Sequence, residues 1–246
     1  PNGSILVTNQ PKDFFLNSIE HFKKAIENQD ILETKVLSYT NERVGIFNNK
    51  IHHHLFGDVE YAKNEFLTCY DSVEFNFNSF WNGMDYIVTE EPTPIDLYIP
   101  NVGEFPGYNL KVYDSSEKRE VDFNILSKSL TYKQIQSITG MIEQIRIDAI
   151  EAKKFKSRQS SELWKQYYQM MNSFTTPFDM YHDNRLIRKK TFDYGYACTV
   201  HKSQGSSINN VFIDMKDIGI CRDELELRQL QYVSVSRAKT NAHILQ

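Results

Sequence analysis

The stretch TVHKSQG, at residues 199–205, places several phosphate-binding side-chain types directly after the strand-like segment GYAC. Thr199 and His201 would lie at the end of that strand, where a hydroxyl and an imidazole can donate hydrogen bonds to phosphate oxygens. Gln204 and Gly205 follow on a turn, and glycine lets the backbone approach a ligand closely. By itself, this stretch fits an ordinary polar turn as well as it fits a phosphate-binding loop.

A second stretch, YVSVSRAK at residues 232–239, places Arg237 and Lys239 beside two serines and after an apolar run. An arginine held rigidly at the end of a strand or turn can reach a terminal phosphate and stabilise the charge that develops in phosphoryl transfer. The ordinary alternative is a surface arginine in a solvated ion pair. The two stretches together, in this order, form a more specific pattern than either one alone.

A third stretch, KVLSYTNERVGIFN at residues 35–48, completes a resemblance to superfamily 1 helicases. It is similar to motif IV of that family, whereas TVHKSQGSS resembles motif V and YVSVSRAK resembles motif VI. HKSQG, together with a β-rich insert between motifs IV and V, is similar to the 1B branch, the 5′-to-3′ DNA helicases of the Dda and RecD type. The resemblance implies the carboxyl-terminal part of such an enzyme. Its fold class would be α/β: a RecA-like second motor domain of the P-loop NTPase type, interrupted by an SH3-like β insert and a helical extension.

The resemblance implies a nucleotide-facing group of residues. Arg237 would be the catalytic arginine finger on the γ-phosphate of ATP, and the turn formed by Gln204 and Gly205 would lie beside the nucleotide. Relatives often carry a glutamate soon after this glycine, where it can meet the ribose. Ser206 and Ser207 stand there in this chain, so the resemblance does not extend to a ribose contact.

The resemblance also implies a DNA-facing group at the ends of two strands. Thr199 and His201 of motif V would face single-stranded DNA, together with Lys202. Thr40 and Asn41 of motif IV follow another short strand, at the position where α/β folds place ligands.

Motif IV departs from some relatives at one position. Tyr39 stands where these relatives carry an arginine, so a second arginine contact to the nucleotide is not implied directly. Arg43, four residues further on, is the candidate to replace it.

The other half of an ATP site is missing from this chain. No GxxxxGK[ST] stretch and no Gly-Lys pair occurs, so the loop that cradles phosphates and supplies a magnesium-binding hydroxyl is absent. Asp223 and Glu224 lie in a polar run and not at the end of an apolar strand. We therefore expect ATP with Mg²⁺ to be held jointly with an upstream RecA-like domain of the same protein, which would supply the Mg²⁺ ligands. The fragment alone should be inactive.

Periodicity divides the chain into alternating α/β and β-rich parts. Apolar spacing of three or four predicts helices at residues 12–30 and 42–57, with a short strand between them at residues 36–37. About five strands are predicted in the β insert, with a hairpin turn at Trp81-Asn82-Gly83. A long strand candidate covers residues 188–200. The predicted domains are 1–60 for the first part of the RecA-like domain, 70–135 for the SH3-like insert, 136–190 for a helical segment and 191–246 for the second RecA-like part.

Composition excludes some classes of protein. A net charge of −4 over 246 residues does not mark a whole-surface nucleic-acid binder, so any polyanion site must be local. Three widely spaced cysteines suggest reduced thiols and neither a disulfide framework nor a zinc site. No apolar run approaches the roughly 20 residues that span a bilayer, so no membrane association is expected. We expect a cytoplasmic protein of a bacterial or phage-infected cell.

Several further features have an ordinary structural reading beside a functional one. Two basic runs could line a DNA channel or form solvated surfaces. Three aromatic residues of the β insert could stack on bases or pack in its core, and core packing is favoured. Three consecutive histidines do not share a helix face, so no metal site is predicted. The first basic run is Lys153, Lys154, Lys156 and Arg158, and the second is Arg185, Arg188, Lys189 and Lys190. The aromatic residues are Trp81, Tyr86 and Tyr98, and the histidines are His52, His53 and His54.

The sequence thus predicts the carboxyl-terminal motor half of an ATP-dependent 5′-to-3′ DNA helicase, with roles in DNA replication or repair. Expected partners are single-stranded DNA, the upstream domain, and replication or recombination proteins. Two alternatives remain open. One is a RecD-like subunit of a nuclease-helicase, and the other is a non-catalytic remnant that binds single strands or a partner.

Overall fold

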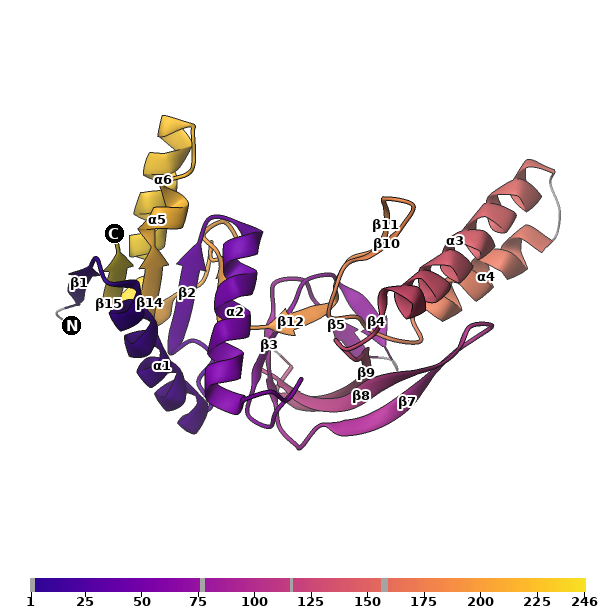
Figure 1. The fold of residues 1–246 in the computed structure, drawn as a ribbon, viewed down its shortest axis with the longest axis horizontal. Helices are drawn as coiled ribbons and strands as arrows, with labels where there is room; N and C mark the ends of the chain where they lie inside the picture. Colours follow the sequence, from indigo (N-terminus) through magenta and orange to yellow (C-terminus); the bar gives the residue numbers. More distant parts are fainter. Residues whose placement is uncertain (1–2, 76–77, 116, 156–158) are drawn as a thin grey trace. The chain divides into compact units, whose positions relative to one another are not determined.

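The computed structural model describes residues 3–75, 78–115, 117–155 and 159–246, and its helices and strands are drawn in Figure 1. The chain divides into two compact units. The first unit comprises Pro1–Val59, Asn64–Leu67 and Tyr194–Gln246, and the second comprises Glu60–Lys63 and Thr68–Asp193. None of the helices in the described residues is long and apolar enough to cross a membrane.

The first unit is built on a five-stranded sheet in the order β1-β15-β14-β2-β13, in which every neighbouring pair is parallel. Parallel strands need crossover connections, and helices provide them. The α/β class predicted for a RecA-like motor domain is confirmed. The strands are β1 (Ser4–Thr8), β2 (Thr34–Ser38), β13 (Ala197–Thr199), β14 (Ile208–Asp214) and β15 (Ala238–Leu245), and the helices are α1 (Pro11–Glu27), α2 (Asn41–Phe56), α5 (Met215–Ile218) and α6 (Glu224–Ser236).

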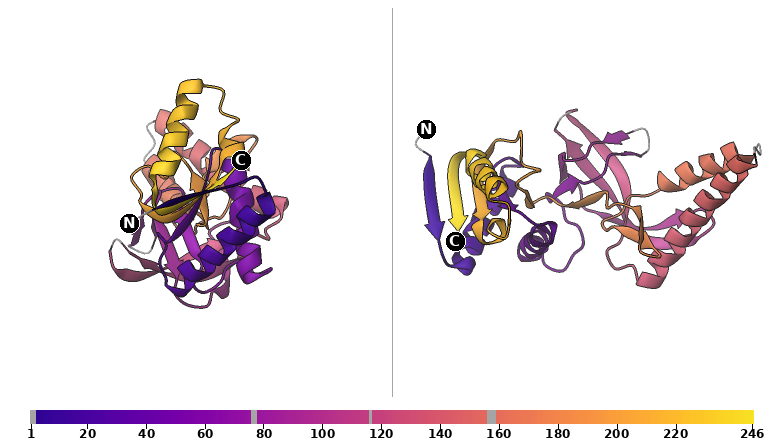
Figure 2. Two further views of the ribbon diagram at one scale, coloured as in Figure 1. Left: turned by 90° about the vertical axis from the view of Figure 1, so that its left-hand side faces the viewer. Right: turned by 90° about the horizontal axis from the view of Figure 1, so that it is seen from above.

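Both faces of this sheet are covered, as the alternation of side chains along β14 demonstrates. Val211 and Ile213 belong to a buried cluster that includes Leu230 of α6. Phe212 points the other way, and its ring lies 5.5 Å from that of Phe14 in α1. Because successive side chains of a strand point to opposite faces, α1 and α6 lie on opposite sides of the sheet, as Figure 2 shows.

The sequence predicted the two amphipathic helices of this unit but not its edge. The helices predicted at residues 12–30 and 42–57 are confirmed as α1 and α2. Strand β1 was not predicted. It lies at the edge of the sheet beside β15 (Figure 2), and Ile5, Leu6 and Val7 are all at least half exposed, so no alternation marks it.

The single strand predicted for residues 188–200 is wrong. This segment contains the end of β11 (Arg185–Arg188), then β12 (Phe192–Tyr194) and β13, which pair in three different sheets. The chain bends at Gly195, whose N–H donates to the carbonyl of Phe66 and not to a partner of β13. The continuous run of β-forming residues therefore gave no sign that the chain changes its pairing strand twice in this segment.

The second unit contains a β-rich part and a helical hairpin. Its main sheet has the order β12-β3-β6-β8-β7, with β9 also paired to β8, and β4 pairs with β5 separately. Seven strands lie in the described residues between 66 and 126. Six of them, β4 to β9, fall in the range 70–135 predicted for the insert, against an expected number of about five. The seven strands are β3 (Phe66–Cys69), β4 (Val73–Phe75), β5 (Asn78–Phe80), β6 (Asp85–Val88), β7 (Thr93–Ile99), β8 (Gly103–Asp114) and β9 (Arg119–Leu126).

The helical segment consists of α3 (Tyr132–Lys154) and α4 (Gln159–Met171), which pack against each other. Thr131 begins α3 with a capping box, since its hydroxyl accepts from the N–H of Gln134 while the Gln134 side chain accepts from the N–H of Thr131. The helical part of this segment ends with α4 at Met171. An antiparallel pair of short strands, β10 (Met180–His182) and β11, follows within the range predicted as helical.

The turn at residues 81–83 is present, but the predicted hairpin is wrong. The N–H of Met84 donates to the carbonyl of Trp81, and Gly83 has a φ of 85°. The strands on either side, β5 and β6, belong to different sheets and so do not pair. A turn signal fixes where the chain reverses, but it does not fix which strands become partners.

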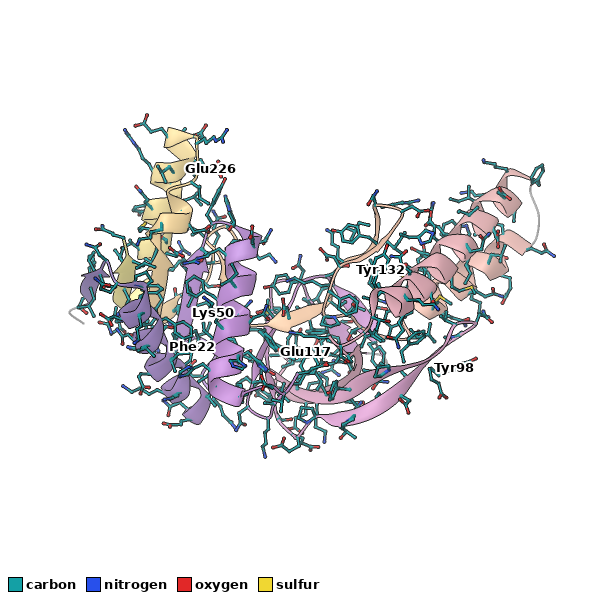
Figure 3. All side chains as sticks on the ribbon, in the orientation of Figure 1. Phe22, Lys50, Tyr98, Glu117, Tyr132 and Glu226 are labelled. Atoms are coloured by element: carbon teal, nitrogen blue, oxygen red, sulfur yellow. The ribbon has the colours of Figure 1, made fainter. Side chains whose placement is uncertain are left out.

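Core packing was favoured for three aromatic residues and holds for one. Tyr86 is buried and its ring contacts that of Phe80. Trp81 and Tyr98 are 54% and 64% exposed, and Tyr98 stands away from the ribbon of β7 in Figure 3. For these two side chains the core reading is wrong.

The basic run of residues 185–190 is largely occupied by local contacts. Arg185 forms an ion pair with Glu143, and Lys190 with Asp193. Arg188 is buried, with its Cζ 4.5 Å from the centre of the Phe174 ring, and burial lowers its pKa to about 10. In the other run, Lys156 and Arg158 lie outside the described residues.

A buried histidine of the first unit, His243, has a lowered pKa. His243 stacks on Phe212 at 4.2 Å, and burial lowers its pKa from 6.5 to about 4. Because the unfolded chain takes up this proton near pH 6.5 and the folded chain does not, the free energy of unfolding should fall between pH 6.5 and about 4. We expect His243→Phe to flatten this decline in urea unfolding curves measured across that range. His53→Gln, on an exposed side chain, should leave the decline unchanged, and an equal decline in the His243 variant would contradict the assignment.

Candidate functional site

The motif IV and motif V stretches meet at one edge of the parallel sheet. Strands β2 and β13 are neighbours, with Ser38 opposite Thr199 at their carboxyl ends. The N–H of Val200 donates to the carbonyl of Ser38 at 2.9 Å, which extends the pairing by one residue. The residues that follow these strands therefore start from adjacent points.

Thr40 is held in place by a buried carboxylate. Asp217 Oδ2 accepts hydrogen bonds from the N–H groups of Tyr39 and Thr40 at 2.7 and 2.8 Å, and Asp217 Oδ1 accepts from Thr40 Oγ1 at 2.9 Å. Thr40 Oγ1 in turn accepts from the N–H of Arg43 and caps α2. The end of β2 is thus fixed to the segment after β14, and the Thr40 hydroxyl proton already has an acceptor.

Arg43 is tied to the same segment. Its Nε donates to Oδ2 of the fully buried Asp214 at 2.6 Å, and its Cζ lies 4.7 Å from the centre of the Phe47 ring. A charge-assisted bond to a buried carboxylate is strong, and breaking it would leave an unpaired charge in the core. Arg43 therefore serves to anchor α2 against β14 in this structure.

The motif V loop is organised by its own hydrogen bonds. Thr199 is buried, and its Oγ1 accepts from the N–H of Lys202 at 3.3 Å. The N–H of Ser203 donates to the carbonyl of Thr199, and the buried Ser203 hydroxyl donates to the carbonyl of Val200. Gly205 has a φ of 88°, a left-handed conformation that favours glycine. The loop is therefore a series of tight turns.

Several side chains at this loop and at the start of α2 are exposed. Lys202 and Gln204 are exposed. Among the described residues, apart from Gly205 and its two chain neighbours, no heavy atom lies within 4 Å of the position where a Cβ on Gly205 would stand. This side of the turn is thus open to an approaching ligand. Asn41, at the first position of α2, is also exposed.

The imidazole of His201 lies near Glu226 of α6 and near Tyr39 of motif IV. Its Nε2 lies 3.4 Å from Oε1 of Glu226 in α6, and its ring centre lies 6.2 Å from that of Tyr39. Figure 3 labels Glu226 near the start of α6. A hydrogen bond to the Cys221 thiol, with the nearby negative groups, raises the pKa of Tyr39. At this end of the loop, therefore, an exposed imidazole sits among polar side chains from three segments.

Arg237 lies at the other end of the loop. It follows the last residue of α6, and its backbone carbonyl accepts from the N–H of Ile208 at 3.0 Å. Its guanidinium donates to the carbonyls of Val233 and Ser206 and to the Ser236 hydroxyl, at 3.3 to 3.4 Å. These are long contacts to neutral acceptors. Among the described residues, no carboxylate lies within ion-pair distance of Arg237.

The predicted residues thus fall into two groups, one at each end of a single loop. Thr199, His201 and Thr40 lie at the carboxyl edge of the sheet, while Arg237 contacts Ser206 directly after Gly205. The predicted roles toward DNA and nucleotide remain predictions.

Sequence reasoning missed the acidic residues that hold this edge together. Asp214 and Asp217 were not identified, although Asp214 ends the apolar strand NNVFID, where α/β proteins place polar groups. Glu226 was missed as well, because nothing in the run DELEL distinguishes the carboxylate that reaches His201.

The three consecutive histidines have separate surroundings. His52 is buried, with its Nδ1 at 2.5 Å from Oε1 of Glu65 and its Nε2 at 2.6 Å from the carbonyl of Val59. His53 is exposed and lies 3.1 Å from Asp58. No cluster of three or more histidine, cysteine or acidic residues suited to a metal occurs in the described part of the chain.

The fold and this site define an α/β domain in which a polar loop follows β13 and an arginine that contacts this loop precedes β15. Residues 194–245 match the family model of the UvrD-like helicase C-terminal domain. The matched region contains both the motif V and the motif VI stretches. The resemblance to the carboxyl-terminal part of a helicase is thereby confirmed.

Other comparisons cover more of the chain. An uncharacterized protein of Acanthamoeba polyphaga mimivirus is 26% identical over an alignment of length 243; the match covers 88% of this chain and 48% of that protein. The Pif1 helicase from Candida albicans is 12% identical, with a TM-score of 0.43, over 95% of this chain and 53% of its own. The Pif1 helicase from Bacteroides, solved with ADP-AlF3 and ssDNA, is 11% identical, with a TM-score of 0.39, over 96% and 50%. The chain spans about half the length of these proteins.

The role of Asp217 can be tested by stability measurements. We expect Asp217→Ala to lower the free energy of unfolding by about 2–4 kcal/mol, because it leaves two backbone N–H groups at the end of β2 without their acceptor. Asp223→Ala is the matched control, since Asp223 makes one exposed capping bond in α6 and should cost about 1 kcal/mol. Equal losses in the two variants, measured by urea unfolding, would refute the anchoring role.

Proposed function

We propose that this chain is the carboxyl-terminal motor half of an ATP-dependent 5′-to-3′ DNA helicase of the superfamily 1B type. The observation that carries the proposal is the match of residues 194–245 to a helicase family, because it covers the loop and the arginine that lie in contact. A loop of this kind suits a motor, since one rigid element can contact nucleotide at one end and nucleic acid at the other.

The nucleotide side of the proposal assigns Arg237 as the arginine finger. Its present contacts are long and involve neutral acceptors, so exchanging them for a γ-phosphate costs little. Gln204 and Gly205 would lie beside the nucleotide, at an exposed turn that is open around Gly205. ATP with Mg²⁺ would be held jointly with an upstream RecA-like domain carrying the Mg²⁺ ligands, and the metal would neutralise charge on the phosphates.

The DNA side of the proposal divides the motif residues by exposure. Thr199 and Thr40 have hydroxyls that already bond within the protein, so they would position the strand ends. His201, Lys202 and Asn41 are exposed and would contact the backbone of single-stranded DNA. His201 would exchange its contact with Glu226 for one with phosphate when DNA binds.

The arginine finger can be tested in the full-length protein that includes the native upstream sequence. We expect Arg237→Ala to lower DNA-stimulated ATP turnover by about 10³-fold or more, because the transition-state charge on the γ-phosphate loses its partner. Arg228→Ala is the matched control: it removes an exposed arginine of α6 that pairs with Glu224. Turnover within about twofold of the parent is expected for that control.

Each outcome of this experiment separates the alternatives. Turnover that survives Arg237→Ala would exclude the arginine finger. Single-strand binding without any turnover would favour a non-catalytic remnant. Nuclease activity that accompanies ATP turnover, alone or with a partner, would favour a RecD-like subunit of a nuclease-helicase.

The DNA contact predicts a change in salt dependence. We expect Lys202→Ala to reduce the slope of log affinity for oligo-dT against log salt concentration by about 0.7, the value for one phosphate contact on a single strand. Lys216→Ala, an exposed lysine of α5, should leave the slope unchanged. Fluorescence anisotropy at several salt concentrations measures both, and an unchanged slope for Lys202→Ala would remove this residue from the DNA interface.

A further inference from the structure

A groove of about 620 Å³ lies between α1 and α2 in the first unit, away from the motif V loop. Its floor is apolar: Phe14, Phe47 and Leu245 are buried there, at most 5% exposed. Phe15 and Ile46 form its walls and remain partly exposed. The volume falls within the range of ligand-binding clefts, and grooves between two helices commonly accept an apolar helix face.

The rim of this groove carries charge of one sign. Lys12 of α1 and Lys50 of α2 line it, and no aspartate or glutamate does. Lys50 is labelled on α2 in Figure 3. Neither ammonium group lies within ion-pair distance of a carboxylate in the described residues. Asp13 and Glu42, in the first turns of the two helices, do not line the groove.

The other basic groups of the rim are partly compensated. Arg43 is neutralised by Asp214, and His53 lies beside Asp58. His54 contacts Phe15 edge-on, with ring centres 5.9 Å apart. Two lysines on opposite walls therefore supply the free positive charge over an apolar floor.

These features favour a protein ligand over a nucleic acid. Binding of single strands relies on exposed aromatic faces that stack on bases along a basic track. Here the rings of Phe14 and Phe47 are buried and contact each other edge-on, at 6.2 Å. Such a floor accepts aliphatic or aromatic side chains inserted from above, while the lysines match carboxylates on their flanks.

We propose that the groove docks an acidic amphipathic segment of a partner protein, with bulky apolar side chains on the floor and carboxylates at Lys12 and Lys50. The proposal does not depend on the helicase assignment, because neither the loop residues 199–207 nor Arg237 line the groove. Arg43 of motif IV does line it, but its guanidinium is bound to Asp214. A ligand confined to one groove of this volume points to a micromolar interaction rather than a permanent one.

The test uses this chain and a fluorescein-labelled synthetic peptide, read by fluorescence anisotropy. The peptide carries leucine and phenylalanine at i, i+4 and i+7 and glutamate at most other positions. Two matched peptides replace the glutamates by lysine or the apolar residues by alanine. The acidic amphipathic peptide should bind with micromolar affinity, and both matched peptides should bind at least about tenfold more weakly.

Variants of the chain locate the binding. Lys12→Glu combined with Lys50→Glu should weaken binding of the acidic peptide at least about tenfold, because it reverses the charge on both walls. Lys24→Glu, an exposed lysine of α1 outside the groove, should change affinity less than about twofold. Ile46→Ala should weaken binding of the acidic peptide several-fold, because it removes apolar surface from one wall of the groove. Thermal unfolding of each variant separates loss of binding from loss of fold.

Several outcomes would overturn the proposal. Equal binding of the lysine-containing peptide, or no effect of the double reversal, would mean that charge does not select the ligand. If oligo-dT competes with the peptide, and if the double variant binds oligo-dT more weakly to the same degree as the peptide, the groove is a nucleic-acid site. A second copy of the chain as the occupant would appear as concentration-dependent dimerisation lost in Ile46→Ala.

Discussion

Two buried carboxylates at the end of β14 determine how the motif residues are arranged. Asp214 and Asp217 lie within one turn of each other, and Asp214 caps the short helix that contains Asp217. Each reaches across to residues that follow β2: Asp214 to Arg43, and Asp217 to Tyr39 and Thr40. Burying a carboxylate is costly unless it is fully hydrogen-bonded, and these contacts provide that compensation. The cost of misplacing either strand end is therefore high.

This arrangement explains why the site consists of loops and yet has a defined geometry. The end of β2 is fixed by Asp217, and the start of the motif V loop is fixed to β2 through Val200 and Ser38. The far end of the loop is fixed by the pairing of Ile208 with Arg237. Each tether joins segments far apart in the sequence, so the positions of the exposed side chains depend on the folded sheet.

The sequence predicted the parts of the fold that follow from local periodicity. The spacing of Phe15, Ile19 and Phe22 identified α1, and the fold class followed from strands alternating with helices. It failed where the outcome depends on distant partners. Residues 188–200 form three strands because they pair with three different neighbours, and β1 is recognised only by its pairing with β15.

The same division applies to the candidate site. Motif order singled out Arg237 and the turn at Gly205, because a family pattern can be read from the sequence alone. It could not identify Asp217, whose hydrogen-bonding partners lie 177 and 178 positions away. An aspartate in the segment DMKD has no local feature that distinguishes an anchor from a surface charge. Only the folded chain shows which acids hold the strand ends.

Three arginines differ in how firmly their surroundings hold the guanidinium group. Arg188 is buried against the Phe174 ring, and Arg43 is bound to a buried carboxylate, so moving either would disrupt the core. Arg237 differs from both, because its guanidinium is partly exposed and makes only long contacts to neutral oxygens. Its backbone, in contrast, is fixed by the sheet through Ile208. A rigid backbone with a weakly held cation is the combination expected of a residue whose strongest partner is an incoming anion.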